Sequence, residues 1–461
     1  MDDAAPILAP PDRAADPAAP RPRLALISTF DELCGIAAYT RALVRQLDAL
    51  AEGTVLDLDQ YLLRGRQRRV RALGDRHIRE FAARLHGFDA VNIQLEYGTL
   101  GRWPGQVLRR LRLLAEAAPA LSVTFHTVLG GSAFPWPRLR GSLLRGRIDV
   151  VIGLVGQFTR ERWLAIGTYR LLVRLQREKP VHAIVHTRRD AQLLRDGFAL
   201  VHVHHHPLAF VRPEEVARIR RTAGRAAFPQ LAALPAGATL IGSFGFLSAY
   251  KGFETAIQAL RYLPEDHHLL LFGAVHPQTI ERERPIDPYI RRLLRIAQIG
   301  QTAFDSLNAG KVRVSYAGDP AALLVEHPES LHRRVHFMGA LEDVRFLEAM
   351  AICDVVVLPY LEVGQSSSGP IAMALEMGCR VLASRTLAFL QLARYHPGRI
   401  EFFDIGNFAE LAELLRMDPS RLPVPGRLRF DADTNLATYR AAHPTLVAAE
   451  RAATVPAGGV R

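Results

Sequence analysis

The segment that decides the fold is DVVVLPYLEVGQSSSGPIAMALEMGCRVLAS, residues 354–384. Its apolar run at 355–358 is typical of a buried strand in a parallel sheet, and a proline ends it. Three serines then lead into a Gly-Pro pair, where a serine can cap a helix, the proline suits its first turn, and Gly378 suits its end. A second apolar strand follows at 381–383. The segment therefore predicts a strand, a polar loop, a helix and a strand, the order of an α/β fold.

The polar loop is predicted to bind an anion. We expect the helix to start at the serines 366–368, with its unpaired N–H groups and positive dipole end at the carboxyl edge of the sheet. Open α/β folds bind their ligands at this edge, and the arrangement suits a phosphate. The alternative is an ordinary strand-to-helix connection rich in Ser and Gly.

This loop resembles the nucleotide-sugar loop of the retaining GT-B glycosyltransferases, the family 4 type (group 1) that includes bacterial mannosyltransferases and glycogen synthases. In that family an acidic residue opens the loop and a second one holds the ribose. Counting back from Gly378 puts these positions at Gln365 and Met373, so both glutamates are absent. Glu376 lies one turn further on and is either a substitute ribose ligand or a solvated helix carboxylate; we favour the second interpretation.

The resemblance implies roles for the loop. Gln365 would orient the sugar, and the amides of Ser367, Ser368 and Gly369 would hold the diphosphate. The altered motif also leaves open a noncatalytic GT-B binding or scaffold protein as the alternative function.

Residues 241–254, IGSFGFLSAYKGFE, are read as a strand end, a loop and a helix that starts near Gly252. They resemble the first strand and loop of the family's donor domain, and Lys251 matches its phosphate lysine. A compact ammonium on a long stem suits a pyrophosphate. The arginine that the family places five residues earlier is replaced by Phe246. The alternative for Lys251 is a solvated lysine at a helix start.

The N-terminal half carries matching pieces. Residues 24–30 form an apolar strand, and 34–40 start a helix, which resembles the family's first strand and glycine turn. Gly35 would let the backbone approach the donor phosphates, because a Cβ there would crowd the cleft. The alternative is a glycine needed only for a tight turn.

Two further apolar strands, at 91–98 and 121–127, end in polar residues that gather at one sheet edge. The resemblance implies that His126 lies beside the transferred sugar and that Glu96 and Tyr97 line the acceptor side. The alternative for His126 is a satisfied structural histidine.

Composition is that of a globular chain of 461 residues, with 49% hydrophobic and 23% charged residues. No apolar run of about 18 residues is present, so we expect no transmembrane helix. Residues 1–21 are acidic at the start and rich in Ala and Pro, which predicts a disordered leader and no signal peptide. The three cysteines show no metal spacing, which favours a reducing cytoplasm and a location in it, or peripheral on the inner face of the membrane.

The net charge of +12 is concentrated at 138–179. Within 160–179, leucines follow one helical face and arginines another. This pattern favours either a helix on an anionic membrane, in keeping with the lipid-linked acceptors of the resembled family, or a core-packed helix with a solvated basic face.

No nucleic-acid module is present, so nucleic acid is not an expected partner. The cluster VHVHHHP at 201–207 is read first as an edge strand and not as a metal site.

The fold class we predict is α/β: GT-B, two Rossmann-like domains facing a central cleft. The first domain spans 22–210 with a basic insertion near 138–179, a linker spans 211–237, the second domain spans 238–415, and 416–461 cross back to the first. The resemblance implies transfer of a hexose, mannose- or glucose-like, with retention, from a nucleoside-diphosphate sugar to a glycan or lipid-linked acceptor in cell-surface polysaccharide or glycolipid synthesis. No metal and no cofactor is expected.

Overall fold

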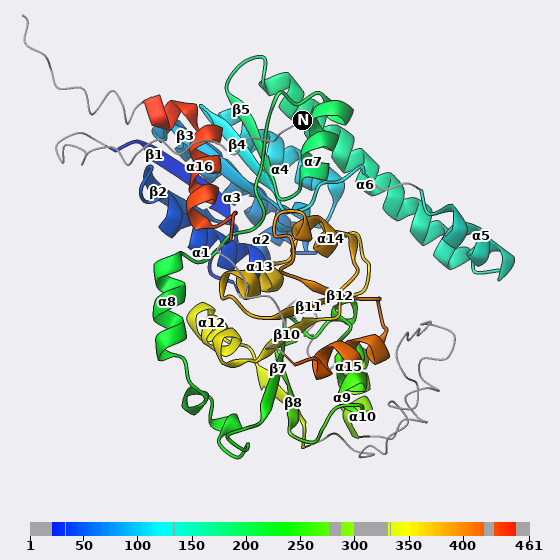
Figure 1. The fold of residues 1–461 in the computed structure, drawn as a ribbon. Helices are drawn as coiled ribbons and strands as arrows, with labels where there is room; N and C mark the ends of the chain where they lie inside the picture. Colours follow the sequence, from blue (N-terminus) through cyan, green and yellow to red (C-terminus); the bar gives the residue numbers. More distant parts are fainter. Residues whose placement is uncertain are drawn as a thin grey trace, which may run out of the picture.

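The computed structural model describes residues 21–32, 34–131, 134–275, 287–298, 331, 333–418 and 428–448. Their strands form two six-stranded sheets that are parallel throughout, one in each half of the chain (Figure 1). The predicted α/β class with two Rossmann-like domains is confirmed. The predicted leader, apart from Arg21, lies outside the described residues.

The first sheet has the strand order β2-β1-β3-β4-β5-β6. Its buried strands are rich in aliphatic residues, because helices cover both faces. The sequence predicted β1, β3, β4 and the edge strand β6 but did not single out β2 and β5. The bounds are β1 (Arg23–Ser28), β2 (Glu52–Asp57), β3 (Ala90–Leu95), β4 (Leu121–Phe125), β5 (Val181–Val185) and β6 (His202–His205).

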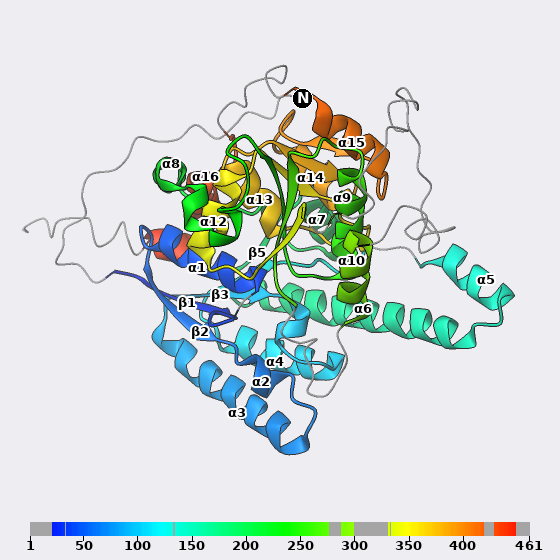
Figure 2. The same cartoon turned by 90° about the horizontal axis from the view of Figure 1, so that it is seen from below.

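The helices of this half are α1 (Gly35–Leu47), α2 (Gln60–Leu63), α3 (Arg68–Arg84), α4 (Pro104–Ala117), α5 (Trp136–Leu144), α6 (Ile148–Leu175) and α7 (Arg188–Gln192), and α8 (Pro213–Thr222) follows in the connection to the second half. The inner end of α6 packs on the sheet, with Leu172 and Leu175 buried in the core. The apolar face of 160–179 is therefore a core face, and the core-packed alternative holds for that segment. The outer end of α6 and the whole of α5 project from the domain (Figure 2).

The second sheet has the order β12-β11-β10-β7-β8-β9. Its strands are β7 (Thr239–Phe244), β8 (His267–Phe272), β9 (Val335–Gly339), β10 (Val355–Leu358), β11 (Val381–Ser384) and β12 (Glu401–Phe403). Its helices are α9 (Phe253–Leu260), α10 (Pro288–Gln298), α12 (Asp343–Ile352), α13 (Gly369–Glu376), α14 (Leu387–Ala393) and α15 (Phe408–Arg416). The strands predicted in this half, at the start of 241–254, at 355–358 and at 381–383, are present as β7, β10 and β11.

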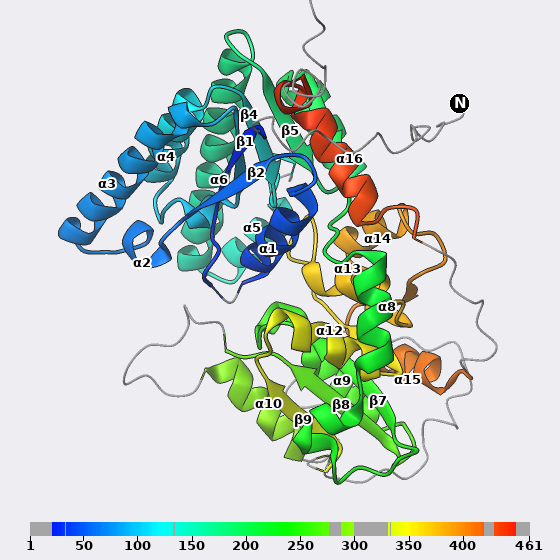
Figure 3. The same ribbon diagram turned by 90° about the vertical axis from the view of Figure 1, so that its left-hand side faces the viewer.

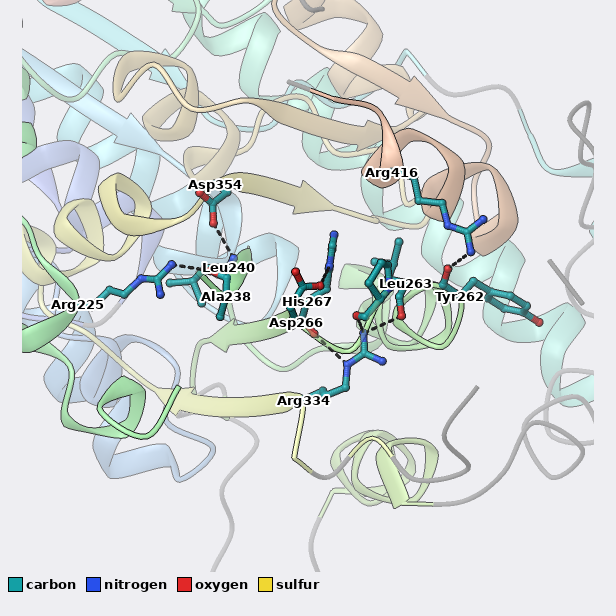
Figure 4. A network of polar contacts seen from close by, with 11 residues as sticks. Arg225, Ala238, Leu240, Tyr262, Leu263, Asp266, His267, Arg334, Asp354 and Arg416 are labelled. Carbon is teal, nitrogen blue, oxygen red and sulfur yellow. Dashed lines mark hydrogen bonds and ion pairs between the residues drawn. The ribbon is translucent and has the colours of Figure 1, made fainter. Parts of the chain in front are cut away.

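Polar contacts hold the amino ends of these strands, opposite the ligand-binding edge (Figure 4). Just before β9, Arg334 donates hydrogen bonds to the carbonyl oxygens of Leu263 and His267 at 3.1 and 3.0 Å. Just before β10, the Asp354 carboxylate accepts one from the Leu240 N–H at 2.7 Å. These bonds satisfy backbone groups where the strands begin.

The C-terminal helix α16 (Ala432–Ala442) lies against the first domain (Figures 1 and 3). It starts with a capping box between Asp431 and Thr434. The Tyr439 hydroxyl meets Thr124 Oγ1 at 2.8 Å, and His443 Nε2 meets Ser122 Oγ at 2.7 Å, both on β4. Helix α16 therefore packs on the first domain.

Candidate functional site

Each sheet has one point at which the strand order reverses, and the predicted residues follow the strands at these points. In the first sheet the reversal lies between β1 and β3, and in the second between β7 and β10. The loops after two strands diverge at such a point and leave a crevice at the carboxyl edge, which is where open α/β sheets bind ligands. Gly35 follows β1, Glu96 follows β3, and Lys251 follows β7.

A cleft of about 410 Å³ joins the two edges. Of the nine predicted site residues, eight line it: Gly35, Glu96, His126, Lys251, Gln365, Ser367, Ser368 and Gly369. The structure therefore brings together, across the two domains, residues that are up to 334 positions apart in the chain.

Lys251 ends a short 3₁₀ turn and is buried, with only 4% of its surface exposed. Its Nζ donates to the Tyr360 hydroxyl at 2.5 Å and lies 4.8 Å from the centre of the Tyr250 ring. No carboxylate of the described residues forms an ion pair with it, and burial lowers the pKa of Lys251 to about 7. The alternative of a solvated lysine is thus wrong.

Two glycines make room for this lysine. Gly245 has φ +128°, and a Cβ there would come within 2.9 Å of Lys251 Cε. Gly252 has φ +61°, and a Cβ there would lie 2.1 Å from the carbonyl oxygen of Pro359. Both positions need a conformation that side chains disfavour and a close approach that a Cβ prevents. The turn is therefore built to hold the ammonium at the cleft.

Tyr360, which the sequence analysis missed, connects the lysine to the serine loop. Its hydroxyl accepts hydrogen bonds from Lys251 Nζ and, at 3.2 Å, from Ser368 Oγ. Ser368 is the N-cap residue of α13, but its side chain makes no capping bond, which corrects the prediction that a serine side chain caps this helix. The first N–H groups of α13 are left for another acceptor, beside the cleft that Ser367 and Gly369 line.

His126 follows β4 and belongs to a buried polar network. Its Nε2–H donates to Gln94 Oε1 at 2.9 Å, because the Nε2 of Gln94 is used as the donor to Asn92 at 2.5 Å. Burial, together with neighbouring His186, holds the pKa of His126 well below its usual range. The ring is neutral near pH 7, with Nδ1 as its acceptor.

Glu96 and Tyr97 are adjacent in sequence but reach different places. Glu96 lines the cleft and accepts a hydrogen bond from Thr127 Oγ1 at 2.7 Å, and burial raises its pKa. Tyr97 is buried in the hydrophobic core of the first domain and does not line the cleft. The expectation that Tyr97 lines the acceptor side is therefore corrected: a short 3₁₀ helix, Tyr97–Thr99, begins directly after Glu96, and the Tyr97 side chain lies in the core.

Glu376 is neither solvated nor in the cleft. Its Oε1 accepts a hydrogen bond from the Phe210 N–H at 2.8 Å, and burial raises its pKa to about 8. Both interpretations made from the sequence are wrong, because the partner of this carboxylate is a backbone N–H donor 166 positions away. Glu376 ties the connection between the domains to the end of α13.

Three further positions complete the comparison with the predicted motif. Gly35 has no positive φ, and a Cβ there would meet nothing within 4 Å, so neither a tight turn nor packing explains the glycine. Gly35 lines the cleft. Met373 and Phe246 also line the cleft, where the resembled family has a carboxylate and an arginine.

An ion pair closes part of the cleft between the domains. Arg41 of α1 donates from Nε and Nη2 to the two Asp343 oxygens of α12, at 2.6 and 2.9 Å. Arg41 Nη1 also donates to the carbonyl oxygen of Phe30 at 2.6 Å. The paired side chains are 25% and 37% exposed, so the pair adds less than about 1 kcal/mol but sets how close the domains lie.

We expect Asp343→Asn to open the ligand-free protein. Without the bidentate charge pair, the domains lose a direct link beside the cleft, and the radius of gyration in small-angle scattering should rise at low salt and change less at high salt. Glu348→Gln is the matched control, because Glu348 pairs with Arg345 of the same helix at 2.9 Å. Equal radii for wild type and Asp343→Asn would contradict the role of the pair.

The described residues contain no group of three or more His, Cys, Asp or Glu side chains placed to hold a metal ion. The β6 histidine His204 instead contacts the neighbouring strand β5, with its Nε2 3.0 Å from His182 Nδ1. None of the described helices has the length and apolar composition needed to cross a bilayer. Three basic side chains line the cleft, Arg41, Arg45 and Lys251.

No protein-family model matches the chain, and no curated protein matches its sequence. Solved structures resemble it along nearly its whole length. Sucrose-phosphate synthase from Thermosynechococcus elongatus is 17% identical, with 94% of this chain and 95% of that chain covered and a TM-score of 0.54. A UDP-forming trehalose-phosphate synthase from Burkholderia xenovorans is 14% identical, with 94% and 96% covered and a TM-score of 0.52.

Anabaena HepE, solved in complex with UDP-glucose, is 15% identical, with 94% of this chain and 98% of that chain covered and a TM-score of 0.50. These structures share two Rossmann-like domains with the chain described here. At such low identity the likeness concerns the fold. The chain has the GT-B fold.

Proposed function

We propose that the protein is a glycosyltransferase that moves a hexose from a nucleoside-diphosphate sugar to an acceptor, with retention at the anomeric carbon and without a metal. The observation that carries the proposal is Lys251: a buried ammonium without a carboxylate partner among the described residues, held beside the uncapped start of α13 in a cleft between two Rossmann-like domains. Burying such a charge is costly unless an anion occupies the site.

The proposed roles follow from the positions in the cleft. The Lys251 ammonium and the amides of Ser367 to Gly369 would stabilise the departing diphosphate, an electrostatic effect for which single groups typically contribute about 3–4 kcal/mol. His126, neutral and anchored through Nε2–H, would accept a sugar hydroxyl at Nδ1, and Gln365 would donate to another. Gly35 would let the diphosphate approach from the opposite domain.

The donor side is further supported by the similar structures, whose names include a UDP-forming synthase and a complex with UDP-glucose. The acceptor would bind on the side of Glu96, a glycan or a lipid-linked sugar, as in the synthesis of cell-surface polysaccharide or glycolipid. Glu96, whose pKa is raised by burial, could hold an acceptor hydroxyl.

A noncatalytic sugar-nucleotide-binding protein is the second candidate. The observation that favours it is Met373, which lines the cleft where the resembled family has its ribose carboxylate. A thioether cannot form the two hydrogen bonds that a ribose offers to a carboxylate. Turnover of a donor separates the two candidates.

We expect a nucleoside-diphosphate sugar to raise the melting temperature of the protein and then to be turned over in EDTA. A ligand at about 100 times its dissociation constant adds roughly 2.7 kcal/mol of stability, so a thermal-shift panel of nucleotide sugars identifies the donor. Turnover of that donor is then measured with magnesium or with EDTA, and the anomeric configuration of the product by proton NMR.

The outcomes decide separate parts of the proposal. Activity lost in EDTA would contradict the metal-independent site. Binding without turnover for any acceptor would support the noncatalytic candidate, and no shift with any donor or nucleoside diphosphate would remove the cleft from nucleotide binding altogether.

A further inference from the structure

The outer hairpin, residues 136–163, is a surface that the function above does not use. It comprises α5 and the outer part of α6, and it projects away from the first domain (Figures 1 and 2). None of the residues of α5 is buried, and the buried residues of α6 begin only at Ala165. Phe134, which precedes α5, packs against α6, with the centre of its ring 4.9 Å from that of Phe158. The hairpin therefore contributes little to the core of the domain.

Large apolar side chains are nevertheless exposed along this hairpin. Leu144 is 88% exposed, Ile152 67% and Ile148 65%. Ile148, Ile152, Val155 and Trp163 fall on one face of α6, because their spacing of three, four and eight residues follows the helix period. The full set is Trp136, Leu143, Leu144, Ile148, Ile152, Val155 and Trp163. An exposed apolar surface of this extent marks an interaction site.

Positive charge surrounds the apolar side chains. The hairpin carries six exposed arginines and only two acidic residues, Asp149 and Glu161: the arginines are Arg138, Arg140, Arg145, Arg147, Arg160 and Arg162. Two tryptophans lie at its ends, Trp136 and Trp163, and the Trp163 ring lies against the start of α4 near Gly105. Tryptophan prefers the boundary between water and hydrocarbon.

We propose that the outer hairpin docks on an anionic lipid surface, with its apolar side chains among the acyl chains and its arginines at the phosphates. Apolar and basic groups together match that surface, because insertion and electrostatic attraction act in the same direction. A second copy of the chain fits poorly, since it would place two sets of arginines against each other. The helices lie on the bilayer and do not cross it.

The position of the hairpin gives this docking a direction. It is inserted directly after β4, and His126 at the end of β4 lines the cleft. Docking would hold the acceptor side of the first domain near the lipid surface, which suits a lipid-linked acceptor; this step alone rests on the proposed function.

The test uses the full-length protein without nucleotide, so it is independent of the cleft. We expect co-sedimentation with vesicles that contain phosphatidylglycerol, much less with pure phosphatidylcholine vesicles, and a decrease with salt. All three tryptophans of the chain are about half exposed, at 51–59%, so their fluorescence should shift to shorter wavelength on the anionic vesicles.

Variants identify the surface. Vesicle binding should weaken at least about tenfold when three apolar residues are replaced together, Leu144→Ser, Ile148→Ser and Ile152→Ser, because the apolar insertion is lost. The preference for anionic vesicles should disappear when four arginines are replaced together, Arg138→Glu, Arg140→Glu, Arg145→Glu and Arg147→Glu. The matched control is Tyr61→Ser with Val201→Ser, whose side chains are 79% and 66% exposed elsewhere.

Unchanged melting temperature verifies that each variant folds. Equal binding to neutral and anionic vesicles, or wild-type binding by the leucine and isoleucine variant, would overturn the proposal. A concentration-dependent dimer in light scattering that the same variant abolishes would also overturn it, in favour of a second copy as the occupant. A protein that docks on vesicles but binds no nucleotide sugar would leave this inference intact and refute the proposed function.

Discussion

Lys251→Met should make the ligand-free protein more stable and, at the same time, weaken nucleotide-sugar binding by at least about tenfold. Lys251 is 4% exposed, and burial lowers its pKa from 10.5 to about 7. This change in pKa means that the buried ammonium destabilises the folded protein by roughly 4–5 kcal/mol below pH 7. Methionine has a similar volume and no charge. Because the Tyr360 hydroxyl loses a donor, we expect a net gain of about 1–3 kcal/mol.

The pH dependence follows from the direction of the pKa change. Between pH 7 and 10.5 the unfolded chain binds the proton that the folded protein has released, so this group makes the wild type more stable as pH rises. The advantage of Lys251→Met is therefore largest below pH 7 and declines toward pH 10.5. Chemical unfolding at several pH values measures it.

Binding should change in the opposite sense. The phosphates of a nucleotide sugar are both esterified and do not titrate near neutrality, whereas only the ammonium form of Lys251 attracts them. Affinity should fall as pH rises above about 7, and the Lys251→Met variant should bind weakly with no such dependence, which calorimetric titration measures. A charged hydrogen bond typically contributes about 1.5–3 kcal/mol, roughly 10- to 150-fold in affinity.

The chain provides an internal control, because it contains only three lysines. Lys179 donates to the carbonyl oxygen of Ala115 at 2.7 Å, far from the cleft in the fold, so Lys179→Met should not change nucleotide binding. A less stable Lys251→Met protein with unchanged affinity would show that Lys251 has only a structural role.

Gly35→Val should abolish most donor binding without destabilising the fold. A Cβ at Gly35 would meet nothing within 4 Å, and its φ is ordinary, so the substitution strains neither the backbone nor the packing. The new side chain would occupy the cleft where the proposed diphosphate lies. Forcing extra methyl groups against a ligand typically costs about 1–3 kcal/mol or more, so we expect a loss of roughly 10- to 100-fold in affinity.

The control is Gly153→Val in the outer part of α6, which also has open space at its Cβ but lies outside the cleft. Both variants should melt within a few degrees of the wild type. Donor binding is measured by titration calorimetry. If Gly35→Val binds the donor as tightly as the wild type, the diphosphate does not approach α1, and the site lies wholly on the second domain.

The arrangement of the sheets was predictable because local patterns determine it. The apolar runs at 355–358 and 121–125 are short and rich in β-branched or aliphatic residues, and each became a buried strand. The strands β2, β5 and β12 were missed: β2 is largely unburied, VHAIV of β5 carries a histidine, and β12 has only three residues. Such strands are recognised by their neighbours in the sheet more than by their own composition.

The environments of the site residues were harder to predict, because contacts distant in sequence create them. Lys251 was expected to be a loop lysine and is buried beneath Tyr360, which follows a strand 109 positions later. Glu376 was expected in solvent and binds the backbone of Phe210. Tyr97 and Glu96 could not be told apart by pattern, since the 3₁₀ helix that begins at Tyr97 was not predicted. The loop motif could indicate a cleft residue, but not its protonation.

The return of α16 to the first sheet restricts how the two domains can move. The chain passes from the first domain to the second before α8 and comes back between α15 and α16, so two separate connections join the domains. A body held by one connection can twist freely, but one held by two retains chiefly rotation about the line through both. Opening and closing should therefore proceed chiefly through a single angle, which brings Lys251 toward or away from Gly35.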